Sequence, residues 1–186
     1  MTNQNTYKTY EEEDSLVIVL YSKTSNFPKI VLMTLLAMTA IGFVALVYNL
    51  IMGNVTDILD VVLPFAIFGL MIAYLGRLFL WNSFGKEILE FTKESFNVQY
   101  DYKLFTSDIE SIEMDYFAVG ITDEQATEPA IKDIIDEDLV KAKLEEGTLE
   151  VRTNGEVFQT VIKLSKEDLL KVIQLIKNYK EKANLR

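Results

Sequence analysis

Residues 30–80 read IVLMTLLAMTAIGFVALVYNLIMGNVTDILDVVLPFAIFGLMIAYLGRLFL, and this segment decides the fold of the chain. Its first part, Ile30–Met52, holds twenty-three residues and no charged side chain. As a helix it is roughly 34 Å long, and the hydrocarbon core of a bilayer is about 30 Å thick. Its second part, Val61–Leu80, carries one charge, Arg77. Buried helices of soluble proteins rarely lack a polar face over such lengths, so the pattern predicts a transmembrane helical hairpin at 30–81, with spans at about 30–52 and 61–81.

Basic residues flank the hairpin at both of its outer ends. The charged residues of its connecting loop, residues 53–60, are all acidic. The flanking basic residues are Lys23, Lys29, Arg77, Lys86 and Lys93, and the acids of the loop are Asp57 and Asp60. The positive-inside rule therefore predicts an inner (plasma) membrane protein with both termini in the cytoplasm. Lys29, Arg77 and Trp81 are the predicted membrane anchors, since long cationic stems and indole rings favour the membrane–water interface.

Small residues recur along the second span. Ala66, Gly69, Ala73 and Gly76 follow one another at steps of three, four and three, which places them on one helix face. Small residues let helices approach closely in lipid. The face is predicted to pack either within the hairpin or against a second copy of the chain.

Cysteine and histidine are both absent from the 186 residues. Their absence excludes disulfides, thiol nucleophiles, zinc sites with cysteine or histidine ligands, histidine-based triads and haem ligation by histidine. The sequence also lacks a glycine-rich phosphate loop and a nucleophile-elbow motif. We therefore expect no enzymatic activity, no cofactor and no metal site.

The net charge of −10 is concentrated in one part of the chain. Asp108–Glu150 has fourteen acids and three lysines, whereas Val151–Arg186 has four acids and eight basic residues. Without a dense basic stripe, nucleic-acid binding is not expected. Pro129 and the apolar spacing that follows it predict an acidic helix at about 129–146. Its polar side carries Asp133, Asp136 and Glu137, which are either contacts for a protein partner or a solvated face.

The C-terminal part, residues 82–186, predicts an α+β domain. Phe96 to Leu104 alternates apolar and polar side chains, as a strand with one buried face does. Further strands are expected at 87–91, 109–117, 148–152 and 157–164, the last two joined by an Asn154-Gly155 turn. Ser165 begins a capping pattern for a helix with the apolar stripe Leu169, Val172, Ile173, Ile176 and Tyr179.

The N-terminal segment, residues 1–29, is expected to be cytosolic. Met1 to Tyr10 is polar and predicted to be loose, and a short strand is predicted at about 15–21, with the question open whether it joins the later sheet. The predicted fold class is a membrane α-helical hairpin plus an α+β soluble domain. The domain is expected to be an antiparallel twisted sheet or a partly open barrel, closed by the C-terminal amphipathic helix.

The order of these elements resembles small bacterial two-pass membrane proteins with a cytosolic pleckstrin-homology-like (YcxB-like) domain. Residues Trp81 to Glu87, Phe96 to Leu104 and Ser107 to Ile112 carry the resemblance. It implies binding or regulation rather than catalysis. No ligand-binding motif matches, so the resemblance transfers no functional residue.

Three functions remain open at this point. We favour a non-enzymatic, membrane-anchored binding or scaffold protein that presents its cytosolic domain to a protein partner. The alternatives are a small membrane effector or toxin-immunity protein acting through the hairpin, and a ligand or lipid sensor with Arg152, Lys163 and Lys166 as anion contacts. The expected partners are the lipid bilayer and either a protein or, through the hairpin, a second copy of the chain.

Overall fold

The chain divides into two compact units, one of which is inserted into the other. The computed structural model describes residues 6–12, 14–53, 59–114, 117–122, 145–153 and 156–183. The first unit combines Met1–Ser22 with Lys86–Arg186, and the second is the continuous segment Lys23–Gly85. The N-terminal residues therefore belong to the same unit as the C-terminal domain.

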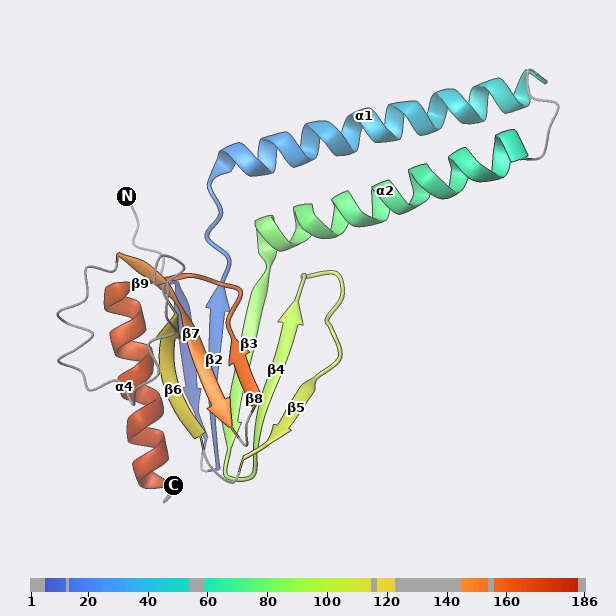
Figure 1. The fold of residues 1–186 in the computed structure, drawn as a ribbon. Helices are drawn as coiled ribbons and strands as arrows, with labels where there is room; N and C mark the ends of the chain where they lie inside the picture. The colour runs from blue at the N-terminus through green and yellow to red at the C-terminus, as the bar shows by residue number, and fades with distance from the viewer. Residues whose placement is uncertain are drawn as a thin grey trace. The chain divides into compact units, whose positions relative to one another are not determined.

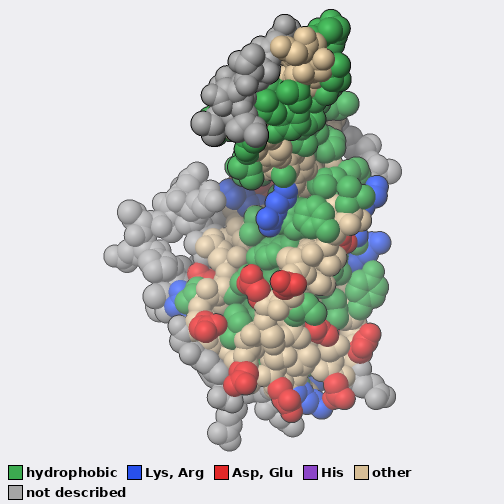
Figure 2. Space-filling model, turned by 90° about the vertical axis from the view of Figure 1, so that its right-hand side faces the viewer, with side chains coloured by type: hydrophobic (Ala, Val, Ile, Leu, Met, Phe, Trp, Pro, Cys, Tyr) green, Lys and Arg blue, Asp and Glu red, His purple; other side chains and the backbone are tan. Residues whose placement is uncertain are grey.

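The inserted unit is a pair of helices, α1 (Asn26–Ile51) and α2 (Leu59–Phe84). The two helices run antiparallel, side by side (Figure 1). By length and composition, both are long and apolar enough to cross a membrane. Figure 2 shows hydrophobic side chains gathered over this hairpin. The two predicted spans fall within these helices, apart from the last residue of the first, and each helix also begins before the predicted span.

A five-stranded antiparallel sheet forms from both ends of the chain. Its strands, in spatial order, are β1 (Tyr7–Glu11), β2 (Ser15–Tyr21), β3 (Lys86–Thr92), β4 (Ser95–Asp101) and β5 (Glu110–Glu113). The register of β2 and β3 runs from Ser15 opposite Thr92 to Tyr21 opposite Lys86. The strand predicted at about 15–21 therefore joins the C-terminal sheet, and the hairpin is inserted between two hydrogen-bonded neighbours.

A second antiparallel sheet contains β6 (Phe117–Thr122), β7 (Glu146–Thr153) and β8 (Glu156–Gln159), and β9 (Leu164–Ser165) pairs with β7. Among the residues that the structure describes, the two sheets are not closed into a barrel. Of the two expected forms, the structure therefore contains the antiparallel sheet. The architecture is α+β. Alternate residues of each sheet point into the core, such as Leu89 and Phe91 from β3 and Leu149 and Val151 from β7.

The closing helix α4 (Lys166–Lys182) confirms the amphipathic pattern. The Ser165 hydroxyl accepts a hydrogen bond from the backbone N–H of Asp168 at 3.2 Å, so the predicted cap is formed. All five residues of the predicted apolar stripe are buried. Figure 1 shows α4 alongside the strands of its unit.

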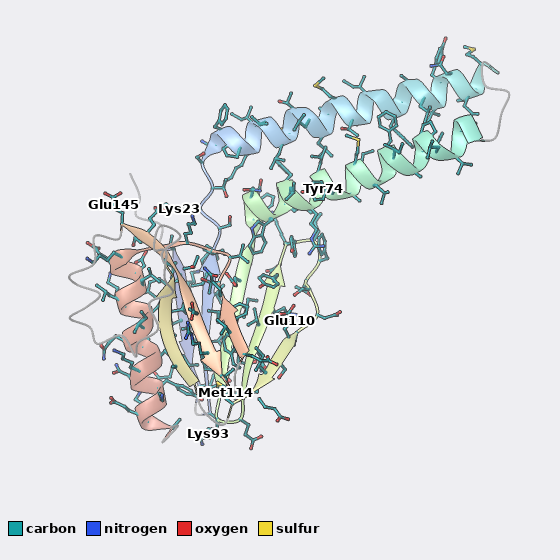
Figure 3. The ribbon with its side chains drawn as sticks, viewed as in Figure 1. Lys23, Tyr74, Lys93, Glu110, Met114 and Glu145 are labelled. Atoms are coloured by element: carbon teal, nitrogen blue, oxygen red, sulfur yellow. The ribbon has the colours of Figure 1, made fainter. Side chains whose placement is uncertain are left out.

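The N-terminal segment is more ordered than its polar sequence predicts. The expectation that Met1 to Tyr10 is loose is wrong from Tyr7 onward, where β1 begins. The segment is held by contacts with the other end of the chain: the Tyr179 hydroxyl donates to the Asp14 carbonyl oxygen at 2.9 Å, and the Lys182 ammonium lies 2.5 Å from a Glu11 carboxylate oxygen. Lys93, labelled in Figure 3, pairs with Asp14 at 2.5 Å.

Three predicted strands have other bounds in the structure. β4 stops at Asp101, not at Leu104, because the Asp101 carboxylate accepts the N–H of Lys103 at 2.6 Å and turns the chain. The strand predicted at 157–164 is divided into β8 and β9. The cause of this division is a side chain of the first sheet, described below. The strand predicted at 109–117 is shortened to β5.

Candidate functional site

The hairpin is held together by aromatic rings around one glycine. The Phe43 ring of α1 lies 5.1 Å from the Phe65 ring and 6.5 Å from the Phe68 ring of α2, centroid to centroid, both edge-to-face. A Cβ atom added at Gly42 would lie 2.9 Å from Cε1 of Phe68. Gly42 therefore lets α1 approach α2 at this ring.

The predicted small-residue face does not contribute to this contact. Ala66, Gly69 and Ala73 are exposed, and Gly76 is half-buried. A Cβ atom added at Gly69 or at Gly76 would meet no heavy atom within 4 Å. Packing of this face within the hairpin is therefore not what the structure contains, and packing against a second copy stays a prediction.

The predicted membrane anchors lie near the outer ends of the two helices. Lys29 is in the first turn of α1, and Arg77 and Trp81 are in the last turns of α2. Trp81 also fixes the end of its helix: its carbonyl oxygen accepts the N–H of Gly85 at 2.8 Å. A Cβ atom at Gly85 would lie 2.7 Å from Cε3 of the indole, so a side chain does not fit there.

Several other predicted contacts are not assembled into a site. Asp133, Asp136 and Glu137, with the acidic helix expected at 129–146, lie outside the described residues. Arg152, a candidate anion contact, pairs through Nε with the Glu150 carboxylate. Within the part of the chain that the structure describes, no three acidic side chains are grouped so as to hold a metal ion.

A buried carboxylate of β3, Glu87, connects the two sheets. Its side chain is 0% exposed and lies on the same face of β3 as Leu89 and Phe91. Oε2 accepts the backbone N–H groups of Val161 and Ile162, each at 3.1 Å, and Oε1 accepts the Val161 N–H at 3.2 Å. The backbone between β8 and β9 thus bonds to a side chain and not to a strand, which is why the predicted strand is divided.

The pKa of the Glu87 carboxyl group is raised towards neutral pH. Burial raises its pKa to about 7, although the N–H groups of Ile162 and Val161 act against this by stabilising the carboxylate. Tyr100 lies opposite Glu87 in the register of β3 and β4. Burial, with a further contribution from the charge of Glu87, raises the Tyr100 pKa to about 12. The contact between the sheets therefore contains a group that titrates near pH 7.

The sequence carried a signal for Glu87. Side chains of a strand alternate between its two faces, so a strand at 87–91 places Glu87 on the same face as Leu89 and Phe91, although the sequence analysis did not single Glu87 out. A carboxylate on such a face needs hydrogen-bond donors. The donors are 74 and 75 residues away in sequence, and no local pattern identifies them.

No protein-family model, curated protein or solved structure matches the chain. The function is therefore inferred from the residues and geometry described above.

Proposed function

We propose that the chain is a non-enzymatic, membrane-anchored binding or scaffold protein. In this proposal α1 and α2 cross the inner membrane, both termini are cytoplasmic, and the two-sheet unit is a cytosolic, pleckstrin-homology-like domain that engages a protein partner. Two antiparallel sheets followed by an amphipathic C-terminal helix agree with such a domain.

The insertion of the hairpin between β2 and β3 is the observation that carries the proposal. The two strands are hydrogen-bonded neighbours, so both ends of the hairpin must be on the same side of a membrane. An even number of spans is the arrangement that allows this, and two apolar helices are available. Their outward side chains include Phe27, Ile41 and Leu70, each at least 69% exposed. So large an exposed apolar surface is unfavourable in water and supports contact with lipid.

The distribution of charge supports the cytoplasmic orientation. Lys23, Lys29, Arg77 and Lys86 are near the ends of the hairpin that join the domain, whereas the connecting loop has Asp57 and Asp60 and no basic residue. Cytoplasmic flanks of membrane spans are enriched in lysine and arginine. The same polarity supports the proposed cytosolic location of the two-sheet unit.

A binding role agrees with the chemistry of the side chains. Without cysteine or histidine the chain lacks a thiol nucleophile and the most common general base, and Glu87 is enclosed by the core and bonded to backbone amides. The most acidic segment, residues 108–150, offers carboxylates for a basic partner surface. Asp133, Asp136 and Glu137 are its proposed contacts.

The partner contact is tested by charge reversal in the full-length protein. Asp133→Lys, Asp136→Lys and Glu137→Lys together should abolish recovery of the partner that is cross-linked to the wild-type chain and purified from detergent extracts, because opposite charges are replaced by like charges.

The matched control reverses three exposed acids outside residues 108–150, Glu94, Glu156 and Glu181, and should retain the partner. Equal recovery with both triple variants would refute the acidic contact. Loss with both would mean that net charge, and not this segment, governs the association.

A further inference from the structure

The turn between β4 and β5 exposes apolar side chains. Leu104 is 75% exposed and Phe105 is 45% exposed, whereas Phe91 and Phe96 of the same unit are fully buried. Ile109, at the end of the same loop, is also exposed. Lys103 lies beside Leu104 at the tip, so the turn combines a cation with two large apolar groups.

Hydrogen bonds and ring stacking define the conformation of this turn. The Tyr102 N–H donates to the Phe105 carbonyl oxygen at 3.0 Å, and the backbones of Asp101 and Thr106 form an antiparallel β-bridge. The Tyr102 and Phe105 rings stack at 4.6 Å between centroids. Lys103 has a φ of 74°, in the left-handed region that residues other than glycine rarely adopt. Leu104 is therefore held at the tip of an ordered turn between β4 and β5.

The turn lies at the end of the sheet where the chain leaves β2 for α1 and enters β3 from α2. Tyr21 is opposite Lys86, and Lys86 is opposite Asp101, so the end of β2, the start of β3 and the end of β4 are level. Figure 1 shows the loop that follows β4 at this end of the sheet. The Lys86 ammonium also pairs with the Asp101 carboxylate at 3.0 Å, which neutralises the acid next to the turn.

The connections to the helices are short. Four residues, 22–25, separate β2 from α1, and Gly85 alone separates α2 from β3. One residue spans at most about 3.6 Å. If α2 crosses a bilayer, the length of the chain keeps this end of the sheet close to the headgroup layer. Apolar and cationic side chains at that depth favour the interface.

We infer that the turn Tyr102–Phe105 is a second membrane contact, in which Leu104 and Phe105 enter the interfacial layer and Lys103 lies at the level of the lipid phosphates. The inference rests on the proposed membrane hairpin. The contact fixes the domain against the lipid surface, so that the hairpin and the turn together determine which face of the domain is presented to a partner.

The test uses the full-length chain in vesicles of phosphatidylcholine and phosphatidylglycerol. Because the chain has no cysteine, Thr106→Cys supplies a single site for an environment-sensitive fluorophore and leaves Leu104 and Phe105 intact. Spin-labelled lipids with the label near the headgroup should quench this fluorophore. Leu104→Asp should reduce the quenching, and Val157→Asp, at a valine that is 60% exposed on β8, should not.

A fluorophore at Ile41→Cys in α1 separates the two possible failures. Quenching at Ile41 by a deep spin label, with none at Thr106, would overturn the inference and leave the membrane hairpin intact. Equal quenching at Thr106 in the wild-type background and in Leu104→Asp would also overturn it. An unquenched fluorophore at Ile41 would refute the proposed hairpin, and the inference with it.

Discussion

The unfolding free energy of the protein should fall by about 3 kcal/mol as the pH rises from about 4.5 through 7, because of Glu87 alone. The pKa of Glu87 is raised from 4.5 to about 7 in the folded protein. The folded chain therefore binds this proton more tightly than the unfolded chain does. The contribution is fully present below pH 4.5 and is lost as the pH rises through 7, since the buried carboxylate must then ionise.

Glu87→Gln should remove this pH dependence. The glutamine carbonyl oxygen can occupy the position of Oε2 and accept the N–H groups of Val161 and Ile162, while the side chain stays neutral at every pH. Denaturant unfolding of the full-length protein in detergent, followed by circular dichroism from pH 4 to pH 8, measures the effect.

The control for this prediction is Glu90→Gln on the same strand. Glu90 accepts a hydrogen bond from the Asn97 amide at 2.9 Å and is half-buried, and a glutamine can also accept that bond. The pH profile of this variant should follow the wild type. A Glu87→Gln profile that falls like the wild type would show that the pH dependence comes from another group.

Phe96→Ala should destabilise the protein by about 3–5 kcal/mol, the usual cost of removing a buried aromatic ring. The Phe96 ring is 0% exposed. Its centroid lies 4.9 Å from the Phe91 ring on β3 and 5.3 Å from the Phe158 ring on β8. The cavity would open between the two sheets. The backbone amides of both sheets should therefore lose protection from hydrogen exchange together.

Hydrogen exchange of the full-length protein in detergent measures this loss strand by strand. Val157→Ala, on β8 beside Phe158, is the control: the side chain is exposed, and its removal should change the free energy by no more than about 0.5 kcal/mol. If Phe96→Ala cost no more than Val157→Ala, the two sheets would not share a core at this ring.

Local patterns predicted the elements whose stability comes from one apolar face. The two long apolar runs identified α1 and α2, and the stripe from Leu169 to Tyr179 identified α4 with its Ser165 cap. The alternation that begins at Phe96 identified β4. In each case the period of the side chains follows directly from the geometry of the helix or strand.

Elements held by distant partners were not predictable in this way. β1 has the sequence YKTYE and no apolar alternation, and it is a strand because it pairs with β2. The division of the strand at 157–164 depends on Glu87, which is far away in sequence. The end of β4 depends on the Asp101 side chain, which overrides the alternation that continues to Leu104.

The proposal that α1 and α2 cross the membrane is tested most directly by labelling single cysteines in intact cells that express the full-length chain. The variants are Glu12→Cys before β2, Glu94→Cys between β3 and β4, and Thr56→Cys in the sequence between the helices. A membrane-impermeant maleimide should label Thr56→Cys in intact cells, and the other two only after permeabilisation. Labelling of Glu12→Cys or Glu94→Cys in intact cells would contradict the cytoplasmic placement of the domain, and recovery of the chain from the aqueous fraction without detergent would contradict the hairpin itself.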